Sequence, residues 1–441
     1  MPHAIDLKSA AREIFTETLS AIDIGQTLRQ KLERSGSRIQ CGAVNLDLAR
    51  FAQIRVVAFG KASHAMAEGL ASVCAPDFPL TGILAGPTPP PRSLAGFEIF
   101  VSGHPVPNQR SFAAARAILK MLGDCGADTL VFFLLSGGGS ALVELPLDPS
   151  ISLEDFQAFH RALVGCGAPI DDINAVRKHL SAVKGGRLAA AAPQAMKITL
   201  GVTDVPEGRE SALASGPTLP DPTTIADARR VVDKYHLLPI LPNSIRAKFT
   251  ASGGLVETPK PEDPAFARAQ FEVVLGMHDL FHHAHIAAES AGFRTICDNS
   301  TDDWPIARAA EFLLGELDRL ARECPGQKVA VIADGEVSSP VLGDGVGGRN
   351  SAFVLECMWK IAGRNVAVLS AGTDGIDGSS PAAGAVASGG SLARALSSGL
   401  DPADFARRSD SYNLFQKLGD TVVTGPTGNN LRDLRILLSA W

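Results

Sequence analysis

The sequence has little of what marks several protein classes. Its 441 residues include only 2 tyrosines and 3 tryptophans, and the formal net charge is 41 − 47 = −6. Without a positive excess no uniform field is present to hold a polyanion, so nucleic acid is not an expected partner. The 7 cysteines include no C-x-x-C pair. This pattern favours free thiols in a reducing cytoplasm over a disulfide framework.

Long hydrophobic runs are also absent. The longest apolar stretch extends from Leu130 to Leu135, whereas a helix needs roughly 20 apolar residues to cross a bilayer. The first residues, MPHAIDLKSAAREIF, lack a basic start followed by an apolar run. We therefore expect a cytoplasmic protein with no membrane partner.

Glycine, by contrast, is plentiful, at 43 of 441 residues, against about 7% in average proteins. Many glycines bound short apolar runs that alternate with helical patterns. Such alternation predicts βαβ units and an α/β fold whose sheet is covered on both faces. The expected strands are Val56 to Phe59, Gly82 to Ala85, Glu98 to Val101, Thr129 to Leu135, Met196 to Val202, Glu272 to Leu275, Val329 to Ile332, Val366 to Ser370 and Arg435 to Leu438.

The strongest break in composition is GGLVETPKPEDPAF at 253–266. Crowded Pro, Glu and Asp indicate a connecting segment. We therefore predict an N-terminal domain over residues 1–250 and a second α/β domain over 251–441. The strand from Glu272 is expected to belong to the second domain.

A triple glycine follows the most apolar strand, in Ser136-Gly137-Gly138-Gly139-Ser140. Residues without Cβ let several backbone N–H groups turn toward one point, and a helix can begin at Ser140. Glycine loops at the carboxyl ends of buried strands are where open α/β sheets bind ligands. We predict an anion site here; the alternative is a flexible turn.

A second strand ends at Gly60-Lys61-Ala62. A lysine at a helix N-terminus works against the helix dipole, which suggests that Lys61 serves a ligand. The spacing G-x-x-x-x-G-K-[ST] occurs nowhere in the chain, so any nucleotide site is not a P-loop.

Basic residues gather in NAVRKHLSAVKGGRLA at 174–189. Arg177 and Lys184 lie seven residues apart and would share one helix face if the helix persists, where they could grip a carboxylate or phosphate. The alternative is a solvated basic face. Asp204 follows the next strand and is placed to hold Mg²⁺, to orient a hydroxyl or to cap a turn.

The second half offers further acidic and glycine-rich loops. Gly343 to Gly348 matches G-x-G-x-x-G, with Asp374 26 residues further on, so a dinucleotide site has to be weighed, although the preceding run is polar and contains Pro340. Asp374 and Asp377 form a possible Mg²⁺ or acid/base pair. Histidines at 278, 282, 283 and 285 could bind zinc or line a solvated helix face, but no H-E-x-x-H pattern or cysteine pair completes a ligand set.

Together these segments resemble the glycerate 2-kinase family, whose members carry an N-terminal kinase domain and a C-terminal MOFRL domain. The segments that carry the resemblance run in order across the chain: GKAS (60–63), SGHPVP (102–107), LSGGGSALVELP (135–146), INAVRKHLSAVKGGRLA (173–189), TDVPEG (203–208), ASGPT (214–218), DGVGGRN (344–350), AGTDGIDG (371–378) and TGPTGNN (424–430).

The resemblance implies ATP-dependent phosphorylation of D-glycerate at its 2-hydroxyl, with Mg²⁺ or another divalent cation. The implied fold has a Rossmann-like, doubly wound N-terminal sheet and a C-terminal α/β domain with a mixed sheet, with the active site in the cleft between them. A homodimer is a further expectation.

The resemblance also suggests roles for the candidate residues. Lys61 and Arg349 would neutralise charge on the transferred phosphoryl group and substrate. Residues 136–140 and Lys184 would hold the nucleotide, and Arg177, Lys184 and Arg349 the substrate. The expected carboxylates are Asp204 in catalysis and Glu336, Asp374 and Asp377 as metal ligands.

Two departures from the family pattern stand out. Asp334 occupies a position where a glycine is expected before Glu336, and Asn429 replaces a threonine. Two other functions stay open. A hydroxypyruvate reductase would use NAD(P)H at Gly343 to Gly348, and a small-anion binding protein would need Lys61 but no catalytic carboxylate.

Overall fold

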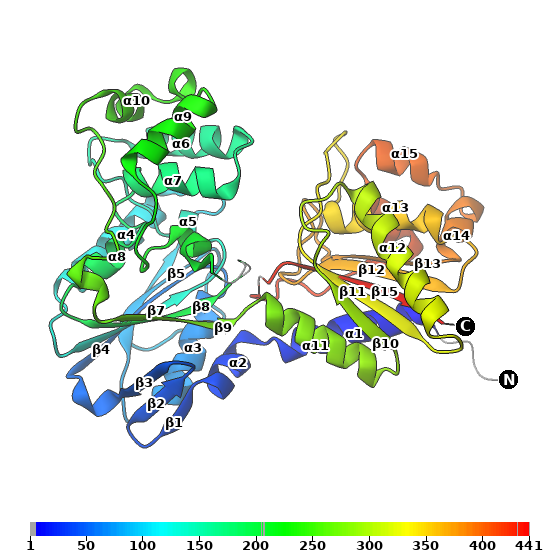
Figure 1. Ribbon diagram of the computed structural model, residues 1–441, viewed down its shortest axis with the longest axis horizontal. Coiled ribbons are helices and arrows are strands. Elements are labelled where there is room, and N and C mark those ends of the chain that lie inside the picture. The colour runs from blue at the N-terminus through cyan, green and yellow to red at the C-terminus, as the bar shows by residue number, and fades with distance from the viewer. Residues whose placement is uncertain (1–5, 204, 206–207, 430, 441) are drawn as a thin grey trace. The chain divides into compact units, whose positions relative to one another are not determined.

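The computed structural model describes residues 6–203, 205, 208–429 and 431–440. The chain forms two compact units. One comprises residues 24–275 and is called the glycine-loop unit here. The other joins residues 1–23 to 276–441 and is called the C-terminal unit (Figure 1).

A six-stranded parallel sheet lies at the centre of the glycine-loop unit, with strand order β6-β5-β4-β7-β8-β9. Numbered from β4 along the chain, this order is 3-2-1-4-5-6, so the direction of progress reverses between β4 and β7. In open α/β sheets, ligands bind outside the carboxyl ends of strands at such a reversal. The strands are β4 (Gln53–Phe59), β5 (Thr81–Gly86), β6 (Phe97–Val101), β7 (Thr129–Leu135), β8 (Met196–Val202) and β9 (Ala269–Leu275).

Apolar strands and amphipathic helices build this unit. Every residue of β7 is buried, because helices cover both faces of the sheet. Figure 1 shows α3 (Ser63–Cys74) on the opposite side of the sheet from α4 (Gln109–Gly123). A second apolar cluster holds a helical layer beside the sheet, formed by α6 (Leu153–Gly165), α7 (Ile170–Leu180), α9 (Ile225–Lys234) and α10 (Asn243–Thr250).

Shorter elements complete the glycine-loop unit. A small antiparallel sheet has the strand order β1-β2-β3. The remaining elements are α2 (Ile24–Lys31), β1 (Glu33–Ser35), β2 (Arg38–Cys41), β3 (Val44–Asp47), α5 (Gly139–Leu142), α8 (Arg187–Ala190) and the 3₁₀ turns Leu48–Arg50, Glu210–Ser215, Leu238–Ile240 and Pro264–Phe266.

The C-terminal unit contains a mixed sheet with strand order β10-β11-β15-β12-β13-β14. Among the strands that the structure describes in this sheet, β10 and β11 pair in parallel and the other neighbours are antiparallel. The strands are β10 (Arg294–Asp298), β11 (Val329–Asp334), β12 (Val366–Gly372), β13 (Gly384–Ser388), β14 (Thr421–Val422) and β15 (Asp433–Ser439).

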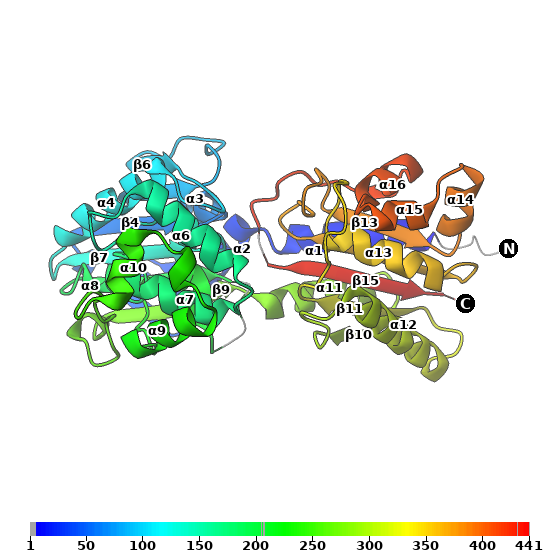
Figure 2. The same cartoon turned by 90° about the horizontal axis from the view of Figure 1, so that it is seen from above.

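Helices cover both faces of the mixed sheet (Figures 1 and 2). The first helix of the chain, α1 (Leu7–Ala21), contacts β12, β13, β15 and α11 (Met277–Ser290). The long α12 (Ile306–Glu323) and α13 (Arg349–Lys360) pack into one apolar cluster on the sheet. The remaining helices are α14 (Ser391–Ser397), α15 (Pro402–Arg407) and α16 (Ser411–Leu418). The prediction of two α/β regions, one with a parallel and one with a mixed sheet, is confirmed at this level.

The division between the units differs from the boundary expected at residue 250. The strand expected to open the second domain is β9, and it pairs in parallel with β8. It therefore completes the glycine-loop sheet, which extends to Leu275. At the other end, α1 and α2 are separate helices, and the chain passes from one unit to the other between them.

Among the described residues, no helix is both long enough and apolar enough to cross a membrane.

Candidate active site

Two loops meet at the carboxyl ends of β4 and β7, where the strand order reverses. The backbone N–H of Lys61 donates to the Gly137 carbonyl at 2.9 Å, and the Ala62 N–H donates to Ser136 Oγ at 2.9 Å. The structure thus brings the predicted lysine and the predicted glycine loop together. Ser136 is fully buried, so its hydroxyl ties the two loops to each other.

Glycine is required at two positions of these loops. Gly60 has φ = +129°, and a Cβ there would lie 2.1 Å from Ser136 Oγ. Gly138 has φ = +82°, and its Cβ would lie 3.1 Å from the His104 ring and 3.4 Å from Lys61 Cγ. At Gly60 the neighbouring atoms leave no room for a Cβ, and at Gly138 the left-handed φ favours glycine. His104 therefore lies beside the loop; its segment, SGHPVP, is one of those that carry the family resemblance.

Lys184 lies beneath the glycine loop. Its Nζ donates to the Ser140 carbonyl at 2.8 Å and to Glu144 Oε2 at 2.5 Å. Only 1% of the Lys184 side chain is exposed and none of the Glu144 side chain. Lys184, which the family resemblance suggested as a nucleotide and substrate ligand, is thus held inside the unit by Glu144, a carboxylate that is not among the predicted site residues.

Glu144 is the centre of this buried group. It also accepts from Ser181 Oγ at 2.5 Å and lies 3.4 Å from His160 Nε2. Burial alone would raise the pKa of Glu144, but Lys184 and His160 outweigh it and lower that pKa to about 2. The carboxylate is therefore ionised at neutral pH and pairs with Lys184.

Arg177 does not share a helix face with Lys184, because α7 ends at Leu180 and the backbone is extended at Ser181. Among the described residues, its guanidinium has no hydrogen-bond or ion-pair partner, and its Nε is buried without one. Burial lowers the Arg177 pKa, and the charge of Glu144 opposes this shift. A partly buried guanidinium with unused donors suits a carboxylate or phosphate ligand.

In the C-terminal unit, Arg349 opens α13 and forms a forked ion pair. Its Nε lies 2.5 Å from Asp433 Oδ2, and its Nη2 lies 2.7 Å from Glu336 Oε1. About 36% of the Arg349 side chain is exposed. The structure therefore brings together two predicted residues, Arg349 and Glu336, and adds Asp433.

Asp377 is bound to the first turn of α13. It accepts from the Asn350 N–H and the Ser351 N–H at 2.9 Å each, and from Ser351 Oγ at 2.6 Å. A carboxylate at a helix N-terminus satisfies donors that have no partner within the helix. Asp374 Oδ1 accepts from the Ile376 N–H at 3.0 Å.

The described residues contain no group of three His, Cys, Asp or Glu side chains able to hold a metal ion. With Asp377 bound to α13 and Glu336 to Arg349, the predicted ligands Glu336, Asp374 and Asp377 do not fit a metal held by the protein alone. Asp204 lies outside the described residues.

Asp334, the departure from the family pattern, is a buried carboxylate at the end of β11. Both of its oxygens lack a hydrogen-bond partner among the described residues. Burial raises the Asp334 pKa to about 6. The other departure, Asn429, donates to the Ile22 carbonyl at 2.9 Å and so ties its loop to the end of α1.

The glycines from 343 to 348 do not form a strand-turn-helix. The preceding strand, β11, ends at Asp334. A Cβ on Gly345 would lie 2.5 Å from Asp410, and one on Gly348 would lie 2.2 Å from Asp377. These glycines are needed for packing against the unit's own residues, whereas a dinucleotide fingerprint needs a strand directly before it.

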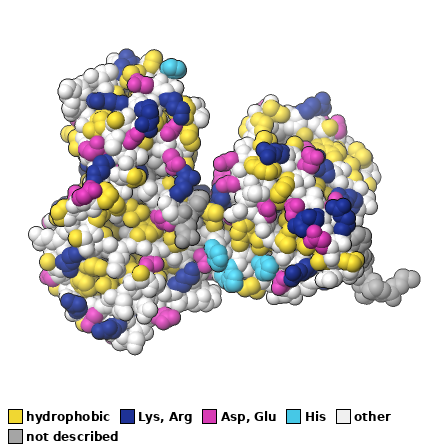
Figure 3. Space-filling view, viewed as in Figure 1, with side chains coloured by type: hydrophobic (Ala, Val, Ile, Leu, Met, Phe, Trp, Pro, Cys, Tyr) yellow, Lys and Arg dark blue, Asp and Glu magenta, His cyan; other side chains and the backbone are white. Residues whose placement is uncertain are grey.

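Histidine side chains gather on the surface over α11 (Figure 3). The rings of His278 and His282 are stacked with centroids 6.3 Å apart, and both residues are exposed. His285 contacts Glu289 and Cys297. Since the described residues show no three-ligand group, a solvated helix face fits these histidines better than a zinc site.

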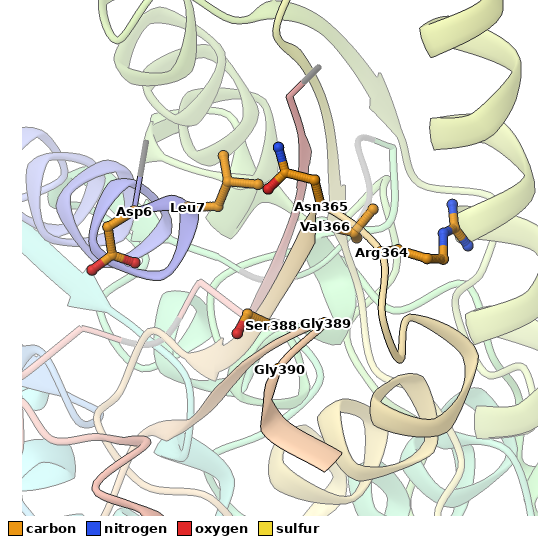
Figure 4. Close-up of a pocket in the computed structure, with 8 residues that line it drawn as sticks. All are labelled: Asp6, Leu7, Arg364, Asn365, Val366, Ser388, Gly389 and Gly390. Carbon is orange, nitrogen blue, oxygen red and sulfur yellow. The ribbon is translucent and has the colours of Figure 1, made fainter. Parts of the chain in front are cut away.

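A pocket of the C-terminal unit lies where β12 begins and β13 ends (Figure 4). It is lined by Asp6, Leu7, Arg364, Asn365, Val366, Ser388, Gly389 and Gly390. Arg349, Glu336 and Asp377 lie toward the opposite end of β12, since Asp433 pairs with Gly372 at the end of that strand. The pocket therefore contains none of the predicted site residues.

Comparison with protein families gives two matches. A domain of unknown function, DUF4147, matches residues 10–250, and the MOFRL family matches residues 329–433. The first covers more than half of the chain.

Comparison with individual proteins agrees. A D-glycerate 2-kinase of Thermotoga maritima is 33% identical over 98% of both chains. A putative hydroxypyruvate reductase of Agrobacterium vitis is 37% identical over 87% of this chain and 86% of its own. A crystal structure of a glycerate kinase from Thermotoga maritima superposes with a TM-score of 0.83 and 32% identity, covering 98% of this chain and 99% of that one. The chain belongs to the glycerate 2-kinase family, with a DUF4147 domain followed by a MOFRL domain.

Proposed function

We propose that this protein transfers the γ-phosphoryl group of ATP to the 2-hydroxyl of D-glycerate and releases 2-phosphoglycerate. The observation that carries the proposal is the pairing of Lys61 with the glycine loop at the β4/β7 reversal. It gives one sheet edge a cation and several backbone donors. Relatives named as glycerate kinases, similar over nearly the whole chain, support the same reaction.

Phosphoryl transfer needs positioning and electrostatic stabilisation more than covalent chemistry. In this proposal, Lys61 and the N–H groups of the glycine loop neutralise phosphate charge, and Arg349 contributes a second cation by exchanging a carboxylate partner for the ligand. The Arg177 guanidinium takes the carboxylate of glycerate. That Lys61 and Arg349 act on one phosphoryl group stays a prediction, as does the Rossmann-like character of the parallel sheet.

Mg²⁺ in proteins is often bound through one or two carboxylates together with substrate phosphates. Because the predicted ligands do not fit a metal held by the protein alone, we derive no catalytic step through such a metal. Use of ATP, a cytoplasmic location and a homodimer are further parts of the proposal.

A hydroxypyruvate reductase is the second candidate, since some relatives carry that name. The packing of Gly345 and Gly348 against Asp410 and Asp377 argues against a pyrophosphate site there. A small-anion binding protein remains the non-catalytic alternative, because Lys61 and Arg177 would serve it equally.

Two parallel assays test the proposal. One follows ADP release from MgATP with and without D-glycerate, and the other follows NADH oxidation with hydroxypyruvate. We expect ADP release only with glycerate. NADH oxidation without ADP release would establish the reductase instead, and glycerate binding without either reaction would establish the binding protein.

Phosphorus NMR of the product distinguishes 2-phosphoglycerate from 3-phosphoglycerate. A 3-phosphoglycerate product would agree with a glycerate kinase activity but contradict phosphorylation at the 2-hydroxyl.

A further inference from the structure

The segment Ala214-Ser215-Gly216 has an unusual backbone. All three residues have positive φ, at +50°, +63° and +62°. Left-handed backbone is uncommon for alanine and serine, costs free energy, and persists where surrounding structure requires it. The segment packs against the glycine loop, because a Cβ on Gly139 would lie 2.8 Å from Ala214 Cβ.

The strained segment carries a buried hydroxyl relay. Ser215 Oγ donates to Asn174 Oδ1 at 2.9 Å and lies 2.8 Å from Ser140 Oγ. Ser215 is fully buried, Asn174 is nearly so, and Ser140 is partly exposed. Ser140 is therefore the solvent-facing end of a chain of hydroxyl and amide groups that leads from the glycine loop into α7.

The direction of the relay follows from the number of protons. A serine hydroxyl has one proton to donate, and that of Ser215 goes to Asn174. The bond between the two serines must then be donated by Ser140. The Ser140 hydroxyl thus donates its hydrogen bond to Ser215, and toward solvent its oxygen can only accept a hydrogen bond.

A second oxygen of Ser140 is also fixed. Its carbonyl accepts from Lys184 Nζ, which is locked to Glu144. With both its carbonyl and its hydroxyl held from the interior, Ser140 has one set orientation. An acceptor oxygen beside a glycine loop cannot give a hydrogen bond to a phosphate oxygen, but it can receive one from a hydroxyl.

We propose that Ser215 is a positioning residue that holds Ser140 as a hydrogen-bond acceptor for the hydroxyl group of a hydroxy-acid substrate. This inference rests on the proposed glycerate phosphorylation and assigns Ser140 to the acceptor hydroxyl, whereas the family resemblance suggested the nucleotide. Ser215 acts only through Ser140, since it has no exposed surface of its own.

The test removes each hydroxyl and both together. In Ser215→Ala, Ser140→Ala and the double variant, D-glycerate binding is measured by calorimetry, and KM values for glycerate and ATP are measured by ADP release. We expect each single variant to weaken glycerate binding about tenfold, the order of one lost hydrogen bond, with KM for ATP changed less than twofold. The double variant should match the single variants, because Ser215 works through Ser140.

Ser215→Gly separates positioning from backbone strain. Glycine adopts φ = +63° readily, so this variant should lose the same glycerate affinity as Ser215→Ala while keeping or raising the melting temperature. Ser72→Ala is the matched control, since the Ser72 hydroxyl donates only to the Gly69 carbonyl of its own helix; it should leave every value unchanged.

Two results would overturn the inference: additive losses in the double variant, or an equal rise of KM for ATP. If the wild-type protein binds D-glycerate but releases no ADP, the proposed kinase activity is wrong. The binding measurements on the variants still decide the role of Ser215. A wild-type protein that neither binds nor phosphorylates D-glycerate overturns both proposals.

Discussion

Each of the two units contains a cation that is paired with a carboxylate. The two ion pairs differ in burial, and burial decides whether the cation can exchange its partner for a ligand. In the glycine-loop unit, Lys184 and Glu144 are almost completely enclosed. In the C-terminal unit, Arg349 keeps about a third of its side chain exposed between Asp433 and Glu336. An enclosed pair cannot exchange a partner without leaving a charge buried, whereas an exposed arginine can release one carboxylate for a ligand. Residue type alone therefore does not tell a ligand-binding cation from a structural one.

The largest expected effect tests the enclosed pair. Glu144→Gln and Lys184→Met should each lower the free energy of unfolding by about 3–5 kcal/mol, because each leaves one buried charge without its partner. The double variant should lose less free energy of unfolding than the two single variants added together. Urea unfolding measures all three, with Lys248→Met as a matched control: its partly exposed pair with Asp148 should contribute far less to the free energy of unfolding. Equal losses of unfolding free energy in Lys184→Met and Lys248→Met would show that enclosure does not distinguish the Lys184–Glu144 pair from an exposed one.

The second prediction concerns a cation expected to serve the ligand. Lys61→Ala should lower kcat by about 10²–10³-fold, the effect typical of removing one electrostatic stabiliser from an active site. The melting temperature should change little, because the side chain is only partly buried at the end of β4. Steady-state kinetics and thermal unfolding measure the two effects. Wild-type turnover in this variant would exclude Lys61 from the mechanism.

Arg349→Lys probes the geometry of the forked pair. Lysine keeps the charge but cannot contact Asp433 and Glu336 with a planar fork. We expect kcat/KM for glycerate to fall about tenfold, ~1.4 kcal/mol in transition-state binding. Unchanged kinetics would show that only the charge at this position matters.

The last prediction concerns the pH dependence that Glu144 adds to stability. Its pKa falls from an ordinary value of 4.5 to about 2 in the folded protein, because Lys184 and His160 outweigh the effect of burial. A lowered folded pKa stabilises the protein above the unfolded value, and this contribution is lost as pH falls from about 4.5 toward 2. The stability difference between wild type and Glu144→Gln should therefore shrink over that range. A constant difference between pH 7 and pH 3 would contradict the assigned ionisation.

The parts of the fold that depend on local pattern were predictable. The strand expected at Thr129 to Leu135 has the same bounds as β7, because a strand buried on both faces is apolar at every position. β13, Gly384–Ser388, was not predictable in this way, because its sequence, GAVAS, has a single β-branched residue among glycine, alanine and serine. The proline-rich segment at 253–266 does connect two elements, α10 and β9, but composition does not reveal which sheet the next strand joins.

The site was predictable only in part, because local sequence pattern does not show which distant residues meet. Lys61 and the glycine loop follow strands directly, so their meeting at one sheet edge follows from the order of parallel strands. The partner of Lys184 is 40 residues away in sequence, and no local pattern marks Glu144 as that partner. Nor does the sequence show that α7 ends at Leu180, which separates Arg177 from Lys184.

The placement of α1 has a consequence for synthesis on the ribosome. Its buried residues, among them Ala11, Ile14 and Phe15, belong to a helix that contacts β12 and β15, which are translated more than 300 residues later. At about 5–20 residues per second, this delay is on the order of tens of seconds. The intervening 24–275 unit can fold in that time, while the strands that cover the apolar face of α1 have not yet been synthesised. Until those strands are made, the apolar face of α1 is an exposed surface that a chaperone can bind.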